Sequence, residues 1–135
     1  MPCITVFIPG IGPNDRIRLS NTKKTEGDKF IIVDASTHIQ EIIQHSALAA
    51  VTRDPNNKLT LDDFWVYVVP TPPAPAVKIT IEALQMPGRN WAWQKNFAET
   101  IANAAGACCN KYAKHVVVFT HMQIEIAGFA EIEIK

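Results

Sequence analysis

The stretch that decides the fold is residues 79–106, ITIEALQMPGRNWAWQKNFAETIANAAG. Apolar and polar side chains alternate in its first part and in the two residues before it, which predicts a half-buried strand over VKITIEAL (77–84). The remainder carries apolar side chains at helical spacing and predicts an amphipathic helix. The expected apolar face holds Trp93, Phe97, Ile101, Ala104, Ala105 and Cys108. HVVVFTHM (115–122) follows and predicts a buried strand, so this half of the chain is expected to be strand, helix, strand.

Working outward, the first half repeats the same plan. CITVFI (3–8) and FWVYVV (64–69) predict strands, and STHIQEIIQHSALAAVTR (36–53) predicts a helix between them. Ser36 or Thr37 is expected to cap this helix, since Thr37 and Gln40 have capping-box spacing. An insertion at residues 11–34 separates the first strand from the helix. Its alternating RIRL and its apolar FIIV predict a hairpin excursion.

The proline-rich residues 71–76 separate the two halves, and we expect them to act as a stiff connector. The chain is then a single domain of 135 residues, with a first unit at 1–70 and a second at 77–135. The predicted fold class is α/β (α+β). Tandem β-α-β units form a four-stranded, mainly parallel or mixed sheet with two helices on one face, plus short hairpins that include one at the C-terminus. The bare face of the sheet is expected to be apolar and to be covered by oligomerisation.

Composition excludes several classes of function. The formal net charge is zero, which gives no electrostatic argument for nucleic acid or an anionic membrane. No apolar run is long enough to span a bilayer. The three cysteines, two of them adjacent, indicate reduced thiols in a cytoplasmic protein. They lack zinc-site spacing, so no metal is expected.

The second half resembles the tautomerase superfamily, which includes 4-oxalocrotonate tautomerase and macrophage migration inhibitory factor. The resemblance covers residues 77–132: a strand, the Gly88-Arg89 turn, a helix with Lys95 near its start, a second strand and the expected terminal hairpin. The first half agrees in the order of its elements and in having Pro2 directly after Met1. The chain therefore looks like a fused form of the family with two β-α-β units.

The resemblance implies a keto–enol tautomerase, an isomerase that needs no cofactor, forms a homotrimer and acts on a small carboxylate-bearing substrate. Pro2 would be the catalytic base once Met1 is removed, because a free α-amine has a pKa near ~8 that an apolar pocket lowers further. Arg89 would bind the substrate carboxylate. Trp91 is expected to pack near Arg89, and Phe129 to wall a pocket at a subunit interface; both are candidate substrate-binding residues.

Departures from the family leave alternatives open. Valines fill the strand in which some relatives carry a second arginine, and Met86 stands where dehalogenase-type relatives place one. Arg16 or Arg18 of the insertion could supply a second arginine. One alternative is a non-catalytic oligomeric binding or structural protein with the same fold. The other is a dehalogenase-like or hydratase-like relative. If the insertion covers Pro2, catalysis is disfavoured.

Overall fold

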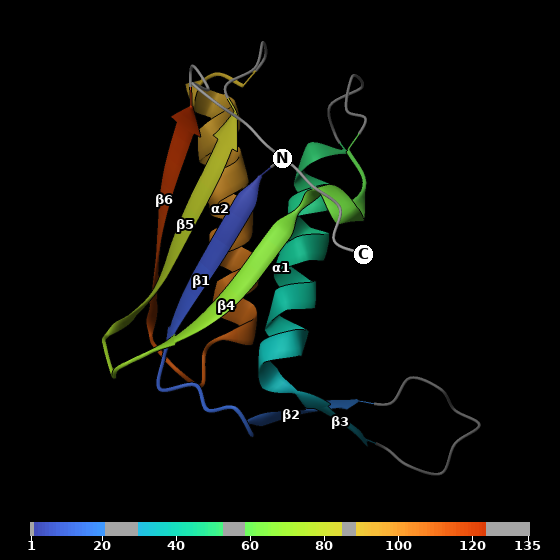
Figure 1. The fold of residues 1–135 in the computed structure, drawn as a ribbon, viewed down its shortest axis with the longest axis vertical. Coiled ribbons are helices and arrows are strands. Elements are labelled where there is room, and N and C mark those ends of the chain that lie inside the picture. The colour runs from blue at the N-terminus through green and yellow to red at the C-terminus, as the bar shows by residue number, and fades with distance from the viewer. Residues whose placement is uncertain (1, 21–29, 53–58, 85–88, 124–135) are drawn as a thin grey trace, which may run out of the picture.

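The computed structural model describes residues 2–20, 30–52, 59–84 and 89–123. Its main sheet has four strands: β1 (Cys3–Pro9), β4 (Trp65–Thr71), β5 (Ala76–Leu84) and β6 (His115–Gln123). They lie in the order β4-β1-β5-β6, with helices α1 (Ala35–Val51) and α2 (Trp91–Cys108) behind one face (Figure 1). A short 3₁₀ helix, η1 (Leu61–Asp63), precedes β4. The predicted fold class, a mixed sheet built from β-α-β units, is confirmed.

The sheet is mixed because of how its two halves join. β1 is parallel to β4, and β5 is parallel to β6, as expected for strands connected through a helix. The central strands β1 and β5 are antiparallel, with Thr5 opposite Thr80. The two strand–helix–strand halves are therefore related by an approximate two-fold axis that passes between the central strands. Residues 72–75 reverse the chain and carry it past the end of β1.

The insertion forms a second, two-stranded sheet. β2 (Arg16–Ser20) pairs antiparallel with β3 (Phe30–Asp34), so the predicted hairpin excursion is present in its described strands. The hairpin lies beside the start of α1 (Figure 1). Two contacts fix it there: the Ala35 N–H donates to the Asp15 carbonyl at 2.9 Å, and Arg16 forms a 2.9 Å ion pair with Asp34.

The core lies between the sheet and the two helices and is apolar throughout its described part. Ile4, Val6 and Ile8 of β1 are fully buried against α1 and α2, because alternate side chains of a strand point to one face. The helices contribute Ile39 and Ile43 of α1 and their counterparts in α2. Of the predicted α2 face, Phe97, Ile101 and Ala105 are buried, while Trp93, Ala104 and Cys108 are partly buried against the same core.

The expected cap of α1 is wrong. Asp34 is the N-cap, and its Oδ2 accepts from the Thr37 N–H at 3.1 Å and from the Thr37 hydroxyl at 2.9 Å. Ser36 and Thr37 lie inside the helix. The reason is that β3 runs directly into α1, so the last strand residue occupies the extended conformation that an N-cap requires.

Candidate active site

Pro2 lies at the start of the central strand β1, and its ring is fully buried. Its carbonyl accepts a hydrogen bond of 3.1 Å from the Trp65 N–H, which ties it to the start of β4. Met1 lies outside the described residues.

Arg89 lies at the same end of the sheet as Pro2. β5 is antiparallel to β1 with Glu82 opposite Cys3, so β5 ends beside the start of β1, and α2 begins there after Arg89 (Figure 1). Asn90 caps α2 by accepting from the Trp93 N–H at 2.9 Å. Arg89 is therefore next to the positive end of a helix dipole, where an anion is stabilised.

Trp93 provides the aromatic surface against Arg89. The Arg89 guanidinium lies 4.8 Å from the centroid of the Trp93 ring, and Trp93 stacks on Phe97 at 5.2 Å with an interplanar angle of 8°. The Arg89 carbonyl also accepts from the Gln94 side-chain amide at 3.1 Å. These contacts anchor both the backbone and the side chain of the candidate carboxylate-binding residue.

The expected packing of Trp91 near Arg89 is not what the structure records. Trp91 is 73% exposed, and its ring lies 5.3 Å from the Lys95 ammonium. The difference follows from helical spacing: Trp91 faces Lys95, four residues later, whereas Arg89 faces Trp93. Trp91 stays a predicted substrate contact. Phe129 and the predicted terminal hairpin lie outside the described residues.

The insertion does not bring a second arginine to this end of the chain's own sheet. Arg16 follows the far end of β1, which is about 20 Å from Pro2 at the usual rise per strand residue. In Figure 1 the hairpin β2–β3 lies at the end of the molecule opposite the chain's N-terminus, so its described strands do not cover Pro2. Arg18 lies on the same hairpin. Neither residue completes an arginine pair with Arg89 within one chain.

Cys3, the residue after Pro2, is a half-buried free thiol. Burial, reinforced by the Glu82 carboxylate opposite it, raises the pKa of the Cys3 thiol. The group is therefore a neutral thiol near neutral pH, and it is not activated as a nucleophile. Within the described ranges, no cluster of three or more His, Cys, Asp or Glu could hold a metal ion.

Comparisons with known proteins identify the fold. No family model and no curated protein sequence matches the chain. Among solved structures, 5-carboxymethyl-2-hydroxymuconate delta-isomerase superposes with a TM-score of 0.61 at 14% identity, covering 98% of this chain and 89% of that one. Malonate semialdehyde decarboxylase gives 0.55 at 9% identity, covering 96% and 92%, and a symmetric trimer of fused 4-OT gives 0.54 at 11%, covering 93% and 91%.

These similarities extend over almost the whole chain, including the first half, in which sequence resemblance was limited to the order of elements and Pro2. They agree with the mixed sheet and the paired helices described above. The chain therefore has the fold of the tautomerase superfamily, as its second half predicted.

Proposed function

We propose that this protein is a keto–enol tautomerase whose catalytic base is the secondary amine of Pro2 after removal of Met1. The observation that carries the proposal is the placement of a fully buried Pro2 and an anchored Arg89 at one end of the sheet. The fold relatives include an isomerase, a decarboxylase and a fused 4-OT, and these names support chemistry on small carboxylates.

The proposed reaction needs one base and one anion site. Arg89, assisted by the amino end of α2, would hold the carboxylate of an enol such as phenylenolpyruvate. The neutral Pro2 amine would take the proton of the enol hydroxyl and return it to the neighbouring carbon, which yields the keto acid. Each step moves a proton, so the chemistry calls on no cofactor.

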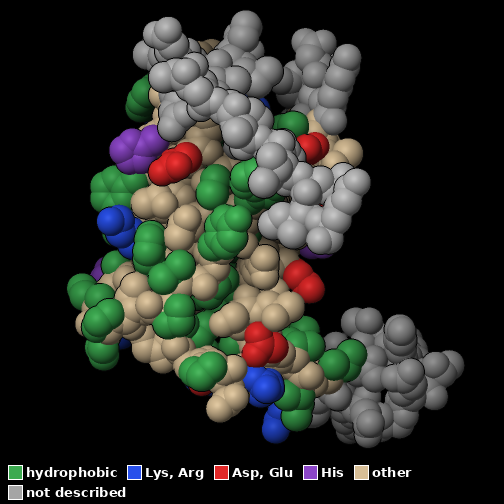
Figure 2. All heavy atoms as spheres, in the orientation of Figure 1, with side chains coloured by type: hydrophobic (Ala, Val, Ile, Leu, Met, Phe, Trp, Pro, Cys, Tyr) green, Lys and Arg blue, Asp and Glu red, His purple; other side chains and the backbone are tan. Residues whose placement is uncertain are grey.

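We further propose that the chain assembles as a homotrimer through the open face of its sheet. This face carries Trp65, Tyr67, Val117 and Phe119, which are 40%, 54%, 41% and 48% exposed. Figure 2 shows hydrophobic side chains spread over the sheet on this side of the molecule. So large an exposed apolar patch is typical of an interface, and the symmetric trimer of fused 4-OT supports a trimer here.

The described part of the chain has no helix with both the length and the apolar character needed to cross a bilayer. All three cysteines are free thiols, which fits the reducing conditions of a cytoplasmic location.

The test is intact mass measurement followed by kinetics with phenylenolpyruvate. We expect mass spectrometry to show loss of Met1. Pro2→Ala should lower kcat by about 10²-fold or more, because the secondary amine and its geometry are lost. Arg89→Gln should raise KM by about tenfold or more, the effect of removing a charged hydrogen-bond donor. Arg18→Gln, on the distant hairpin, is the matched arginine control and should leave both constants unchanged.

Retention of Met1, or full activity in Pro2→Ala, would contradict the proposal. A processed protein that assembles but does not convert phenylenolpyruvate or related enols would favour a non-catalytic binding protein. Release of halide from a halogenated substrate, with no change in the rate of keto–enol conversion, would favour the dehalogenase-like alternative.

A further inference from the structure

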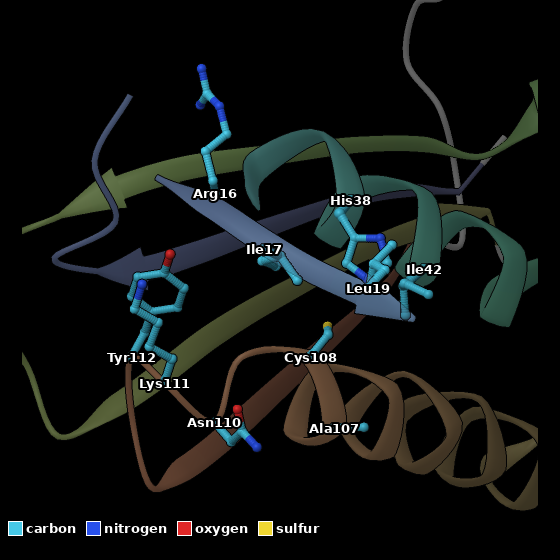
Figure 3. A pocket seen from close by; sticks show the side chains of 10 residues that line it. All are labelled: Arg16, Ile17, Leu19, His38, Ile42, Ala107, Cys108, Asn110, Lys111 and Tyr112. Carbon is cyan, nitrogen blue, oxygen red and sulfur yellow. The ribbon is translucent and has the colours of Figure 1, made fainter. Parts of the chain in front are cut away.

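A cavity of about 440 Å³ lies at the end of the molecule opposite Pro2. It is enclosed by β2, the first turns of α1 and the carboxyl end of α2 with the turn that follows (Figure 3). Its size falls in the range of about 300–1,000 Å³ typical of small-molecule sites. The insertion forms one wall, so this cavity exists because β2 lies beside the amino end of α1 and the carboxyl end of α2.

The lining of the cavity is mainly apolar and is drawn from three separate segments. Ile17 and Leu19 of β2 face Ile42 of α1, and Cys108 closes the side formed by α2. All four side chains are partly buried, and they leave apolar surface that a bound molecule could cover. Each square ångström of apolar surface removed from water contributes about 25 cal/mol, so the main attraction is for an apolar body.

The lining has neutral polar groups, at Asn110 and Tyr112, and its charged groups are cationic. Arg16 and Lys111 both line the cavity, together with His38, and no carboxylate of the described residues does. Arg16 makes its hydrogen bonds to described residues, to the Asp15 carbonyl and the Asp34 carboxylate, through Nη1 alone. The Asp34 carboxylate therefore already matches the charge of Arg16, whose side chain points away from the cavity in Figure 3, and Lys111 is the cation of the lining that can meet an anion.

The two acids nearest the rim are held by groups in the walls. The Asp34 carboxylate caps α1 through Thr37 with one oxygen and pairs with Arg16 at 2.9 Å with the other. The Asp15 carboxylate accepts from the Gly12 N–H at 3.1 Å and from the Tyr112 hydroxyl at 2.8 Å. Both acids therefore belong to the walls of the cavity, while Lys111 borders its open space.

We propose that this cavity is a second, non-catalytic binding site for a small molecule with an apolar body and one anionic end, such as a medium-chain carboxylate. The apolar body would lie among Ile17, Leu19 and Ile42. The anionic end would meet Lys111 at the rim. The site is independent of the Pro2 end, so its test does not depend on the proposed catalytic activity.

Cys108 supplies a built-in reporter of occupancy. Its sulfur lies 3.8 Å from that of Cys109, and this contact lowers the pKa of the Cys108 thiol and raises that of Cys109. Cys109 is buried, whereas Cys108 borders the cavity. Iodoacetamide should therefore modify Cys108 first of the two. Cys3, at the opposite end of the sheet, is the internal reference thiol.

The experiment uses octanoate as the probe and octanamide as its neutral counterpart. Calorimetry measures binding, and peptide mass spectrometry follows the alkylation rate of each cysteine. We expect octanoate to bind and to slow alkylation of Cys108 by about tenfold at a concentration of about ten times its Kd, while Cys3 is unaffected. Octanamide should bind about two- to fivefold more weakly, which corresponds to about 0.4–1 kcal/mol for an exposed charge pair.

Two variants locate the site. Ala107→Trp fills the cavity from an exposed position of α2 and should weaken octanoate binding by about tenfold or more. Asn103→Trp is its matched control, because residue 103 is exposed one turn earlier on the same helix and does not line the cavity. Lys111→Gln should reduce the affinity for octanoate to that for octanamide, within the same two- to fivefold range as above.

Absence of octanoate binding, equal affinity for octanamide, or binding that Ala107→Trp leaves unchanged would each overturn the proposal. None of these outcomes bears on Pro2, and turnover of phenylenolpyruvate by Ala107→Trp should equal that of the unmodified protein. Failure of the cavity and failure of the tautomerase proposal are therefore distinguishable.

Discussion

At the scale of single residues, Asn90 is the residue that connects the stability of α2 to the placement of Arg89. Its side chain accepts from the Trp93 N–H, and Trp93 in turn packs under the Arg89 guanidinium. Asn90→Ala should lower the free energy of unfolding by about 1 kcal/mol, the usual cost of losing an N-cap. Urea unfolding measures this. Asn96→Ala, at an exposed interior position of the same helix, should be neutral or slightly stabilising; equal losses in both would contradict a capping role.

Tyr112 and Asp15 give stability a dependence on pH at both extremes. Burial and the Asp15 carboxylate raise the pKa of Tyr112 to about 12, so its contribution is complete below pH ~10, the unfolded pKa, and is lost as pH rises toward about 12. Hydrogen bonds from Gly12 and Tyr112 lower the pKa of Asp15, so its contribution is present above pH ~4 and is lost on further acidification.

The comparison of unmodified protein with Tyr112→Phe checks this dependence. Urea midpoints should differ most between pH 5 and 9, a window of about four pH units set by the ordinary pKa values of the two groups. The difference should shrink toward pH ~12 and below pH ~4. A difference that stays constant across the whole range would show that the hydroxyl makes no ionisation-linked contact.

At the scale of elements, the helices are held mainly by the apolar stripes that face the sheet. Ile101 of α2 is fully buried in the core, so Ile101→Ala should cost about 2–5 kcal/mol, whereas Ile101→Val should cost about 0.5–1.5 kcal/mol. Asn103→Ala, at an exposed position of the same helix, provides the comparison, and denaturant unfolding measures all three. A loss below about 1 kcal/mol for Ile101→Ala would contradict the packing of α2 on the sheet.

The strands and helices were also the part of the structure that could best be predicted from sequence. Apolar and polar side chains alternate in residues 77–84, and apolar side chains recur at helical spacing in residues 91–108. Both patterns arise because one side of the strand or helix is buried, so a short stretch of sequence is enough to predict them. The cap of α1 was missed because three of the four residues 34–37, namely Asp34, Ser36 and Thr37, offer capping side chains, and only the end of β3 decides among them. The contact between Arg89 and Trp93 could not be predicted, because the sequence does not show which tryptophan of α2 faces Arg89.

The second cavity could not be predicted from sequence. Its walls come from Ile17, Ile42 and Cys108, which lie far apart in the chain and meet only because β2 lies beside one end of each helix. Pro2 and Arg89 could be identified from sequence because Pro2 stands beside a recognisable strand start and Arg89 beside a recognisable helix start. The antiparallel pairing of β1 with β5 brings those two starts to one end of the sheet. Their chemical roles rest on the resemblance and await the kinetic test.

At the scale of the whole molecule, the proposed trimer depends on the open face of the sheet. Phe119 lies midway along the edge strand β6, opposite Thr80 in the register and beside Lys78, whose ammonium is 5.7 Å from its ring. Phe119→Glu should convert the trimer to monomers, because it places a carboxylate in an apolar interface. Sedimentation measures the change. Asn103→Glu, on the outward surface of α2, should leave the trimer intact; a trimer in both variants would place the interface elsewhere.

The approximate two-fold relation between the halves has a consequence for shorter chains. Residues 76–123 contain a whole strand–helix–strand unit, and its strand β5 offers the pairing edge that β1 occupies in the full chain. Thr80 would lie on the symmetry axis if β5 met a second β5 in the same antiparallel arrangement. A peptide made from this half alone would therefore find its natural complement in another molecule of itself, and one short gene would encode a self-pairing miniature of the present sheet.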